Sequence, residues 1–170
     1  VNIFKPLYEN AEIMKVGQNI KYDIEVLRRY DVEVRGPLFD TMIAHYLIQP
    51  ELHHNMDYLA EIYLNYQTIH IEELIGPKGR GQKSMRDLAP TDIYEYAAED
   101  ADVTLKLKNI LQPKLKELGV EELFHHIEMP LIQVLADMEL SGVVLDTKAL
   151  AETAETFNNR LLELEQRIYE

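Results

Sequence analysis

Tyr96 and Asp100 are the side chains whose types and spacing say most about chemistry. Both fall in a segment, 91–111, whose pattern predicts a helix. Residues four apart lie on one helix face, so the phenol and the carboxylate point the same way, one turn apart. A carboxylate can hold a divalent cation, and a neighbouring phenol can orient a water molecule beside it. Because a buried carboxylate needs such compensation, the pair is a stronger candidate than a lone core tyrosine.

A second segment ends in another carboxylate, Asp23, four residues after Asn19. Asn19 is predicted to cap a helix over 20–30 through its side-chain oxygen, which places Asp23 in the first turn. Taken alone, Asp23 would be a surface residue of that helix. Asp40 follows a short apolar run and is predicted to be the N-cap of the next helix, and only a weak site candidate.

The elements that must position these side chains alternate in type along the first half of the chain. Short apolar runs predict strands, and periodic segments between them predict helices, an order typical of a helix-rich α/β fold. Pro113 is expected to kink or end the long central helix. The predicted helices are 1–13, 20–30, 41–48, 56–66 (capped by Asn55), 91–111, 127–140 and 147–170, and the predicted strands are 14–17, 38–40 and a strand-like connector at 143–146.

The clearest loop, 76–83, is also the most basic stretch of the sequence. It combines Gly, Pro and cations without periodicity. Such a segment is most often a surface loop without a further role. Lys78, Arg80 and Lys83 are nevertheless candidates to contact phosphate.

The bulk composition describes an acidic chain of 170 residues with a net charge of −13, room for one domain or slightly more. This charge argues against a nonspecific nucleic-acid-binding surface, although carboxylates that bind divalent cations reverse the local sign. The absence of cysteine excludes disulfides and thiolate metal sites and fits a cytoplasmic location. The adjacent pairs His53-His54 and His125-His126 are not expected to hold a metal, because neighbours in sequence point apart.

Five short motifs occur in a fixed order along the chain. They are KVGQNIKYD at 15–23, FDTM at 39–42, MDYLAE at 56–61, YAAEDADVT at 96–104 and IEMPL at 127–131. In this order and at this spacing they resemble the 3′–5′ exonuclease domain and the start of the polymerase domain of bacterial family A DNA polymerases, the DNA polymerase I family. Each motif alone is weakly specific, and together they cover essentially the whole chain.

The resemblance implies a ribonuclease H-like fold of the DEDDy type, a mixed sheet flanked by helices. Its site uses four carboxylates and a tyrosine around two divalent cations, Mg²⁺ or Mn²⁺, which stabilise the attacking and leaving oxygens of a phosphodiester. Asp23 matches the carboxylate of the second motif and Asp100 that of the third, so both are implied to be catalytic metal ligands. Tyr96 matches the catalytic tyrosine that orients the attacking water.

The resemblance also implies contacts with the single-stranded 3′ end of DNA. Gln18 and Asn19 match a segment that lies against the terminal nucleotides, and the loop 76–83 matches a region near the entering strand. Met85 stands where some relatives carry an aromatic residue that could stack on a base, which weakens a stacking role here. The nucleic-acid-binding candidates are Gln18, Asn19, Lys78, Arg80, Lys83 and Met85.

One departure from the family pattern concerns its first motif, an Asp-x-Glu on the central strand. This motif belongs well before Asp23, and the sequence begins too late to contain it. Two of the four metal-binding carboxylates and the first strands of the sheet are therefore expected to be missing. We expect little or no nuclease activity from the chain alone, and possible dimer contacts through an exposed strand edge at 15–18.

Residues 1–118 are predicted to form the C-terminal part of the exonuclease domain, and 119–170 the connector and first thumb helix of the polymerase domain. The implied whole protein is a DNA-directed DNA polymerase of the bacterial cytoplasm, which acts on primer-template DNA in replication and repair and proofreads with its 3′–5′ exonuclease.

Two alternatives stay open. One is a catalytically silent exonuclease-like support domain of a family A polymerase, against which the retained Asp23, Tyr96 and Asp100 argue. The other is an exoribonuclease with the same acids and tyrosine, against which the polymerase-like stretch 127–146 argues.

Overall fold

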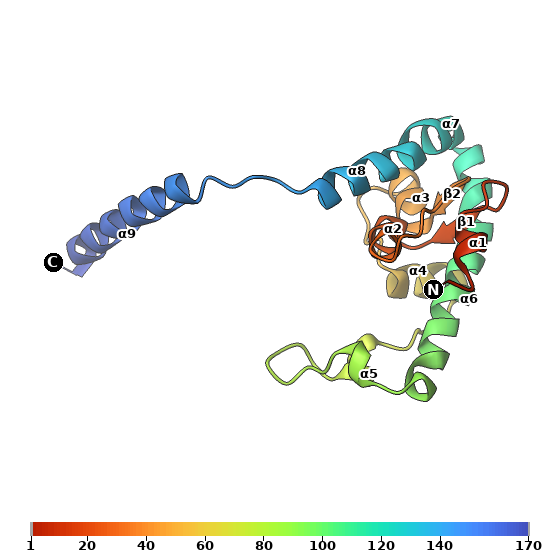
Figure 1. The fold of residues 1–170 in the computed structure, drawn as a ribbon, viewed down its shortest axis with the longest axis horizontal. Helices are drawn as coiled ribbons and strands as arrows, with labels where there is room; N and C mark the ends of the chain where they lie inside the picture. The colour runs from red at the N-terminus through yellow and green to blue at the C-terminus, as the bar shows by residue number, and fades with distance from the viewer. Residues whose placement is uncertain (1, 170) are drawn as a thin grey trace. The chain divides into compact units, whose positions relative to one another are not determined.

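The computed structural model describes residues 2–169, which divide into two compact units, one ending at Met138 and the other beginning at Glu139 (Figure 1). In chain order the elements are α1 (Lys5–Tyr8), β1 (Lys15–Gly17), α2 (Ile20–Arg28), β2 (Leu38–Asp40), α3 (Thr41–Ile48), α4 (Met56–Leu64), α5 (Ile71–Ile75), the 3₁₀ turn η1 (Met85–Asp87), α6 (Pro90–Glu117), α7 (Glu121–Leu123), the π-helical turn η2 (Phe124–Glu128), α8 (Met129–Ser141) and α9 (Thr147–Tyr169).

The sheet of the first unit consists of the two parallel strands β1 and β2, with Val16 opposite Phe39 and Gly17 opposite Asp40. The connection between them runs through α2, as parallel strands require a crossover. Ile20 and Ile24, four apart on one face of α2, are buried. The predicted helix-rich α/β order is therefore confirmed for this part of the chain.

The core of the first unit lies between the sheet and the helices α3, α4 and α6, which contact one another or the sheet. Figure 1 shows α6 running along the side of the unit, beside β1 and α4. Its apolar residues recur every three or four positions, the spacing of a single buried stripe. The fully or almost fully buried members of this stripe are Val103, Leu107, Leu111 and Leu115.

The long helix α6 corrects one prediction, because it continues past Pro113 to Glu117 instead of ending near Leu111. Proline removes one backbone donor and costs about 3 kcal/mol in an isolated helix. Leu111 and Leu115 are both buried on either side of it. Packing of these side chains holds the helix together across the proline.

The helix predicted over 127–140 is also longer, since α7, η2 and α8 follow one another from Glu121 to Ser141. Pro130 lacks an N–H, and its ring would crowd the carbonyl four residues earlier in a regular helix. The π-helical turn immediately before it widens the backbone there. Phe124, at the start of this turn, is buried against Phe39 with 4.8 Å between ring centroids.

Two further predictions were wrong in detail. The helix expected over 1–13 is only the short α1, whose residues bury no apolar side chain, and Val1 lies outside the described residues. The stretch 143–146 forms no strand. Both segments have little buried apolar surface, so no packing energy enforces the predicted structure on them. The short helix α5 was not predicted.

The second unit contains the end of α8 and the helix α9, which confirms the helix predicted from Thr147 as far as Tyr169. The apolar residues of α9 form one stripe with spacings of seven, four, three and four, typical of a helix that packs on another helix. This stripe consists of Leu150, Phe157, Leu161, Leu164 and Ile168, all of them exposed.

Candidate active site

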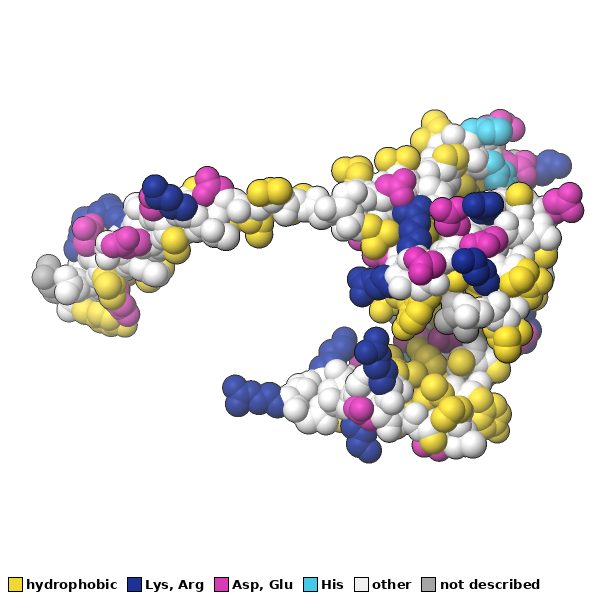
Figure 2. Space-filling view, in the orientation of Figure 1, with side chains coloured by type: hydrophobic (Ala, Val, Ile, Leu, Met, Phe, Trp, Pro, Cys, Tyr) yellow, Lys and Arg dark blue, Asp and Glu magenta, His cyan; other side chains and the backbone are white. Residues whose placement is uncertain are grey.

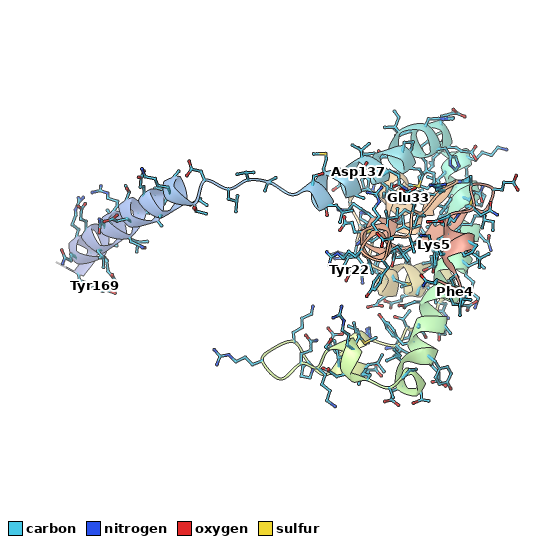
Figure 3. The ribbon with its side chains drawn as sticks, viewed as in Figure 1. Phe4, Lys5, Tyr22, Glu33, Asp137 and Tyr169 are labelled. Carbon is cyan, nitrogen blue, oxygen red and sulfur yellow. The ribbon has the colours of Figure 1, made fainter. Side chains whose placement is uncertain are left out.

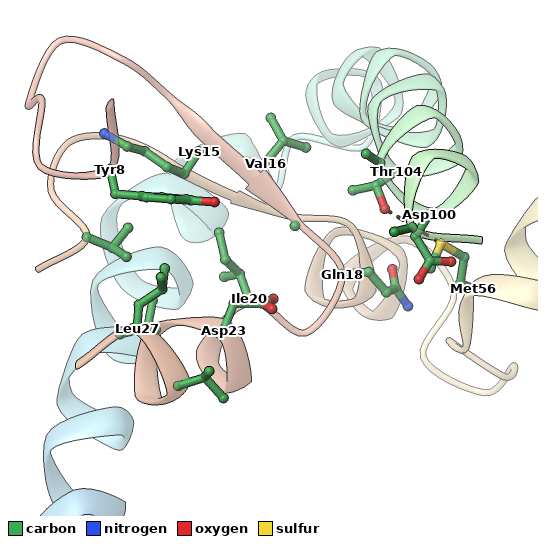
Figure 4. A pocket seen from close by; sticks show the side chains of 16 residues that line it. Tyr8, Lys15, Val16, Gln18, Ile20, Asp23, Leu27, Met56, Asp100 and Thr104 are labelled. Atoms are coloured by element: carbon green, nitrogen blue, oxygen red, sulfur yellow. Dashed lines mark hydrogen bonds between the residues drawn. The ribbon is translucent and has the colours of Figure 1, made fainter. Parts of the chain in front are cut away.

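Asp23 and Asp100 line the same pocket, a cavity of about 700 Å³ (Figure 4). Asp23 comes from the first turn of α2, and Asp100 comes from α6 on the other side of the pocket. The strand β1 and the turn that follows it, including Gln18, complete the wall between the two helices. The fold thus brings together two carboxylates that are far apart in sequence.

Tyr96 lies one turn before Asp100 on α6, so that the phenol and the carboxylate influence each other's pKa. Tyr96 does not itself line the pocket, but it is half-buried next to a residue that does. Burial raises the pKa of Asp100, and the negative charges of Glu99 and Asp57 raise it further against the effect of the Tyr96 hydrogen bond. Burial and the Asp100 charge likewise raise the pKa of Tyr96, which keeps the phenol protonated as a donor.

Burial also raises the pKa of Asp23, and the negative charge of Asp40 adds to the rise. The residue as a whole is exposed, so water still reaches the carboxylate and limits the effect. Tyr22, the residue before Asp23 in α2, is 64% exposed (Figure 3). Among the described residues, no positively charged side chain contributes to the pKa shift of either carboxylate.

The start of α2 is held differently from the prediction. Asn19 adopts a left-handed conformation (φ 58°, ψ 49°), and its side chain makes no capping hydrogen bond. The Asp40 carboxylate accepts instead from the backbone N–H groups of Asn19 (3.3 Å) and Ile20 (2.7 Å). The sequence pattern missed this because the cap comes from a residue that follows α2 in the chain.

Asp40 is the N-cap of α3 as predicted, accepting from the N–H groups of Met42 (2.8 Å) and Ile43 (3.2 Å). Its side chain is 1% exposed. Burial raises the pKa of Asp40, and the four backbone hydrogen bonds oppose that rise. One buried carboxylate thus serves the N-termini of two helices, which its position after a strand did not indicate.

Gln18 is already engaged within the protein. Its amide nitrogen donates to the His54 carbonyl at 2.7 Å, and its amide oxygen lies 2.5 Å from the Thr41 hydroxyl. Asn19 is exposed. A contact of either residue with a nucleotide stays a prediction, and for Gln18 it would require one of these hydrogen bonds to be exchanged.

The basic loop 76–83 protrudes from the first unit, and Figure 2 shows dark blue side chains gathered around it. Lys78, Arg80 and Lys83 are exposed, while Met85 is half-buried in η1. The N–H of Lys83 donates to the Ile75 carbonyl at 2.9 Å and closes the loop at its base. The three cations therefore belong to one protruding loop.

Glu99, the residue before Asp100 on α6, is engaged within the protein. Its carboxylate accepts from the Tyr66 hydroxyl at 2.6 Å and from the Ile69 N–H at 2.8 Å. It therefore ties the segment after α4 to α6, next to Asp100. Asp102 is paired with Lys106 on the exposed side of the same helix.

The donor set of the pocket fits part of a divalent-cation site. Asp23 and Asp100 offer the carboxylate oxygens that Mg²⁺ and Mn²⁺ prefer, and a cation would balance charges that burial disfavours. Within residues 2–169, however, no three His, Cys, Asp or Glu side chains converge on a metal position. His54 contacts His45 of α3 instead, with 2.7 Å between the two Nδ1 atoms.

Comparison with known proteins decides the family. Residues 1–116 match the family described as 3′–5′ exonuclease. The chain belongs to this family. The resemblance to bacterial family A polymerases drawn from the five motifs is thereby confirmed, because the curated relatives of the chain are bacterial DNA polymerases.

Among these relatives, the DNA polymerase I of Pseudomonas aeruginosa is 38% identical over 170 residues, and the alignment covers 98% of this chain and 18% of the relative. The DNA polymerase I of Chloroflexus aurantiacus is 36% identical, with 100% of this chain and 18% of the relative covered. The chain therefore spans less than a fifth of the length of these relatives.

A solved structure described as the POL domain of Pol1 from M. smegmatis, in complex with DNA primer-template and dNTP, has a similar fold. The TM-score is 0.75 at 20% identity, with 95% of this chain and 25% of that chain covered. At this identity the likeness concerns the fold alone. In the described part of this exonuclease-family chain, no helix has the length and apolar character needed to span a membrane.

Proposed function

We propose that this chain is the part of a bacterial DNA polymerase I that trims the 3′ end of DNA by metal-assisted hydrolysis. The observation that carries the proposal is that Asp23 and Asp100 line the same pocket, with Tyr96 one turn before Asp100 on α6. The parallel β1-α2-β2 unit covered by α6 is consistent with a ribonuclease H-like fold of the DEDDy type.

Asp23 and Asp100 would hold the divalent cations together with carboxylates supplied from outside the described residues. The two cations, when bound, would supply positive charge to the attacking and leaving oxygens. The Tyr96 hydroxyl, kept protonated by its raised pKa, would hold the attacking water beside Asp100. The buried apolar stripe of α6 would fix the orientation of this helix, and with it Tyr96 and Asp100, relative to the pocket.

The DNA strand would approach along the basic surface formed by Lys78, Arg80 and Lys83. These side chains can neutralise phosphates, a contribution that weakens with added salt. Asn19 lies at the pocket edge on the turn before α2, and Met85 could give an apolar contact but not a stacking platform.

Further proposals concern the start of the polymerase domain, the DNA substrate and location of the whole protein, and a dimer of the chain alone. Residues 119–170 would begin the polymerase domain, and the protein would act on primer-template DNA in the bacterial cytoplasm.

Among the described strands β1 pairs only with β2, so its other edge is open to pairing. A dimer through 15–18 of the chain alone would appear by light scattering as a doubled mass.

The direct test uses the full-length protein and a single-stranded oligonucleotide with a labelled 5′ end, in Mg²⁺ or Mn²⁺. Asp23→Ala and Asp100→Ala are each expected to lower the rate of 3′ trimming by about 100-fold or more, with DNA synthesis unchanged. Tyr96→Phe should lower it by about tenfold to 100-fold through loss of the hydroxyl.

Matched controls come from the same helix. Asp102→Asn removes a carboxylate that is paired with Lys106, and Tyr94→Phe removes a hydroxyl bonded to Glu95. Both should trim DNA at the parent rate. Full activity in Asp100→Ala, or an equal loss in Asp102→Asn, would refute the proposal.

The chain alone should show little trimming, because its described residues offer no third ligand near the two carboxylates. Robust 3′ trimming by the purified 170-residue chain in Mn²⁺ would contradict the proposed division of ligands.

A further inference from the structure

We propose that Asp40 and Thr41 are positioning residues for this site, acting through the turn from Gly17 to Ile20 to set where α2 presents Asp23. We call these two side chains the Asp40–Thr41 clasp. The inference rests on the proposed function, since it assigns a role in the placement of Asp23. Asp40 does not line the pocket, so it is not itself a ligand candidate.

The two side chains of the clasp make hydrogen bonds to both ends of the turn from Gly17 to Ile20. Asp40 accepts from the N–H groups of Asn19 and Ile20 at 3.3 and 2.7 Å. The Thr41 hydroxyl lies 3.1 Å from the Gly17 carbonyl and 2.5 Å from Gln18 Oε1, and its single hydrogen can go to either. Both residues are almost fully buried, which strengthens these bonds and makes their loss costly.

The first N–H groups of α2 depend on this clasp because Asn19 makes no side-chain cap. Asn19 also holds a left-handed conformation, which persists in a non-glycine residue only where surrounding contacts enforce it. An ordinary N-cap would accept hydrogen bonds only from the N–H groups of α3. Asp40 differs because its carboxylate also accepts from the N–H groups at the start of α2.

Asp23 follows Ile20 by less than one helical turn, so α2 transmits any movement of its start directly to the carboxylate. Asp23 is exposed, and its position is therefore set mainly by the helix that carries it. A displacement of about 1 Å is enough to lower activity strongly where ligands must converge on a cation. The clasp would thus act on cation binding and not only on stability.

The test measures, in the full-length protein, the Mn²⁺ concentration that gives half-maximal 3′ trimming, together with the rate at saturating Mn²⁺ and the melting temperature. Asp40→Asn should raise the half-saturating concentration by about tenfold, the usual effect of losing an outer partner of a metal ligand. Thr41→Val keeps the shape of the side chain and should raise it in the same direction, by about threefold.

Two controls separate positioning from stability. Ile132→Val shortens a core side chain of α8 that does not line the pocket, and should lower the melting temperature without changing the Mn²⁺ dependence. Asp146→Asn weakens a cap whose carboxylate accepts from the Ala149 N–H, and should also leave that dependence unchanged.

Failure of the clasp and failure of the proposed function give different results. If Asp23→Asn leaves the Mn²⁺ dependence unchanged, the proposed role of Asp23 falls. If Asp23→Asn shifts it while Thr41→Val and Asp40→Asn behave like Ile132→Val, only the clasp is refuted. If Asp40→Asn does not fold, Thr41→Val alone decides. In support, Asp40→Asn should add no further shift to Asp23→Asn.

Discussion

The two helices that carry the pocket carboxylates are supported in different ways. α2 has 9 residues, and its start is fixed by hydrogen bonds that backbone N–H groups donate to Asp40. α6 has 28 residues, and the turns after Asp100 are fixed by a buried apolar stripe. A hydrogen-bonded support depends on single atoms and their direction, whereas a packed support depends on volume. The two sides of the pocket should therefore fail under different kinds of substitution.

The largest expected loss of stability comes from the packed side. Leu107→Ala would leave a cavity beneath α6, because Leu107 has no exposed surface. The free energy of unfolding of the Leu107→Ala variant should be lower than that of the parent by about 2–5 kcal/mol, measured by urea denaturation. Leu105→Ala, on the same helix at a residue 52% exposed, is the control and should change it by no more than about 0.5 kcal/mol. Equal losses in both would contradict the packing account.

A smaller loss should follow from crowding the hydrogen-bonded side. A Cβ on Gly17 would lie 2.8 Å from Ile20 Cβ, an atom fixed by the backbone at the start of α2. Gly17→Ala should therefore shift α2 and lower the free energy of unfolding by about 1–3 kcal/mol.

Gly81→Ala provides the matched control for that substitution. A Cβ there meets nothing within 4 Å, in the basic loop. Urea denaturation of the two variants should place Gly81→Ala near the parent. If Gly17→Ala is equally harmless, the start of α2 can move without cost, and the contrast between the two supports would be lost.

The smallest effect concerns pH and the carboxylates themselves. The pKa of Asp100 is raised in the folded state, so its contribution to stability is present below the unfolded pKa, about 3.9, and is lost as the pH rises through the folded pKa. Without cations, Asp100→Asn should therefore raise the melting temperature at pH 7 and give no gain near pH 3. Mn²⁺ should stabilise the parent more than the variant. A variant that is less stable than the parent at pH 7 would show that the charge is compensated.

The same contrast explains how much of the fold and site could be predicted. The helix around Tyr96 and Asp100 and the strands before α2 and α3 were evident from periodicity and local spacing. The course of α6 past Pro113 was not, because it depends on the buried contacts of Leu111 and Leu115 with distant segments. Local propensity gives the cost of a proline but not the packing energy that offsets it.

The support of α2 was hidden for a related reason. Asn19 has the residue type of an N-cap, but the cap comes from Asp40, which only the parallel pairing of β1 and β2 brings close. The Asp-Thr pair after a buried strand was the available signal, and it indicated a cap for α3 alone. Hydrogen bonds between residues distant in sequence have no periodicity to reveal them.

The left-handed backbone of Asn19 has a consequence for sequence variation at that position. Glycine adopts this conformation freely, whereas a β-branched residue would be strained by about 1–2 kcal/mol. Asn19→Gly therefore deletes an exposed amide while leaving the chain path intact. In a library of variants selected for folding, glycine and asparagine should dominate this position. Selection for binding of a DNA end would distinguish asparagine, which carries the amide, from glycine, which lacks it.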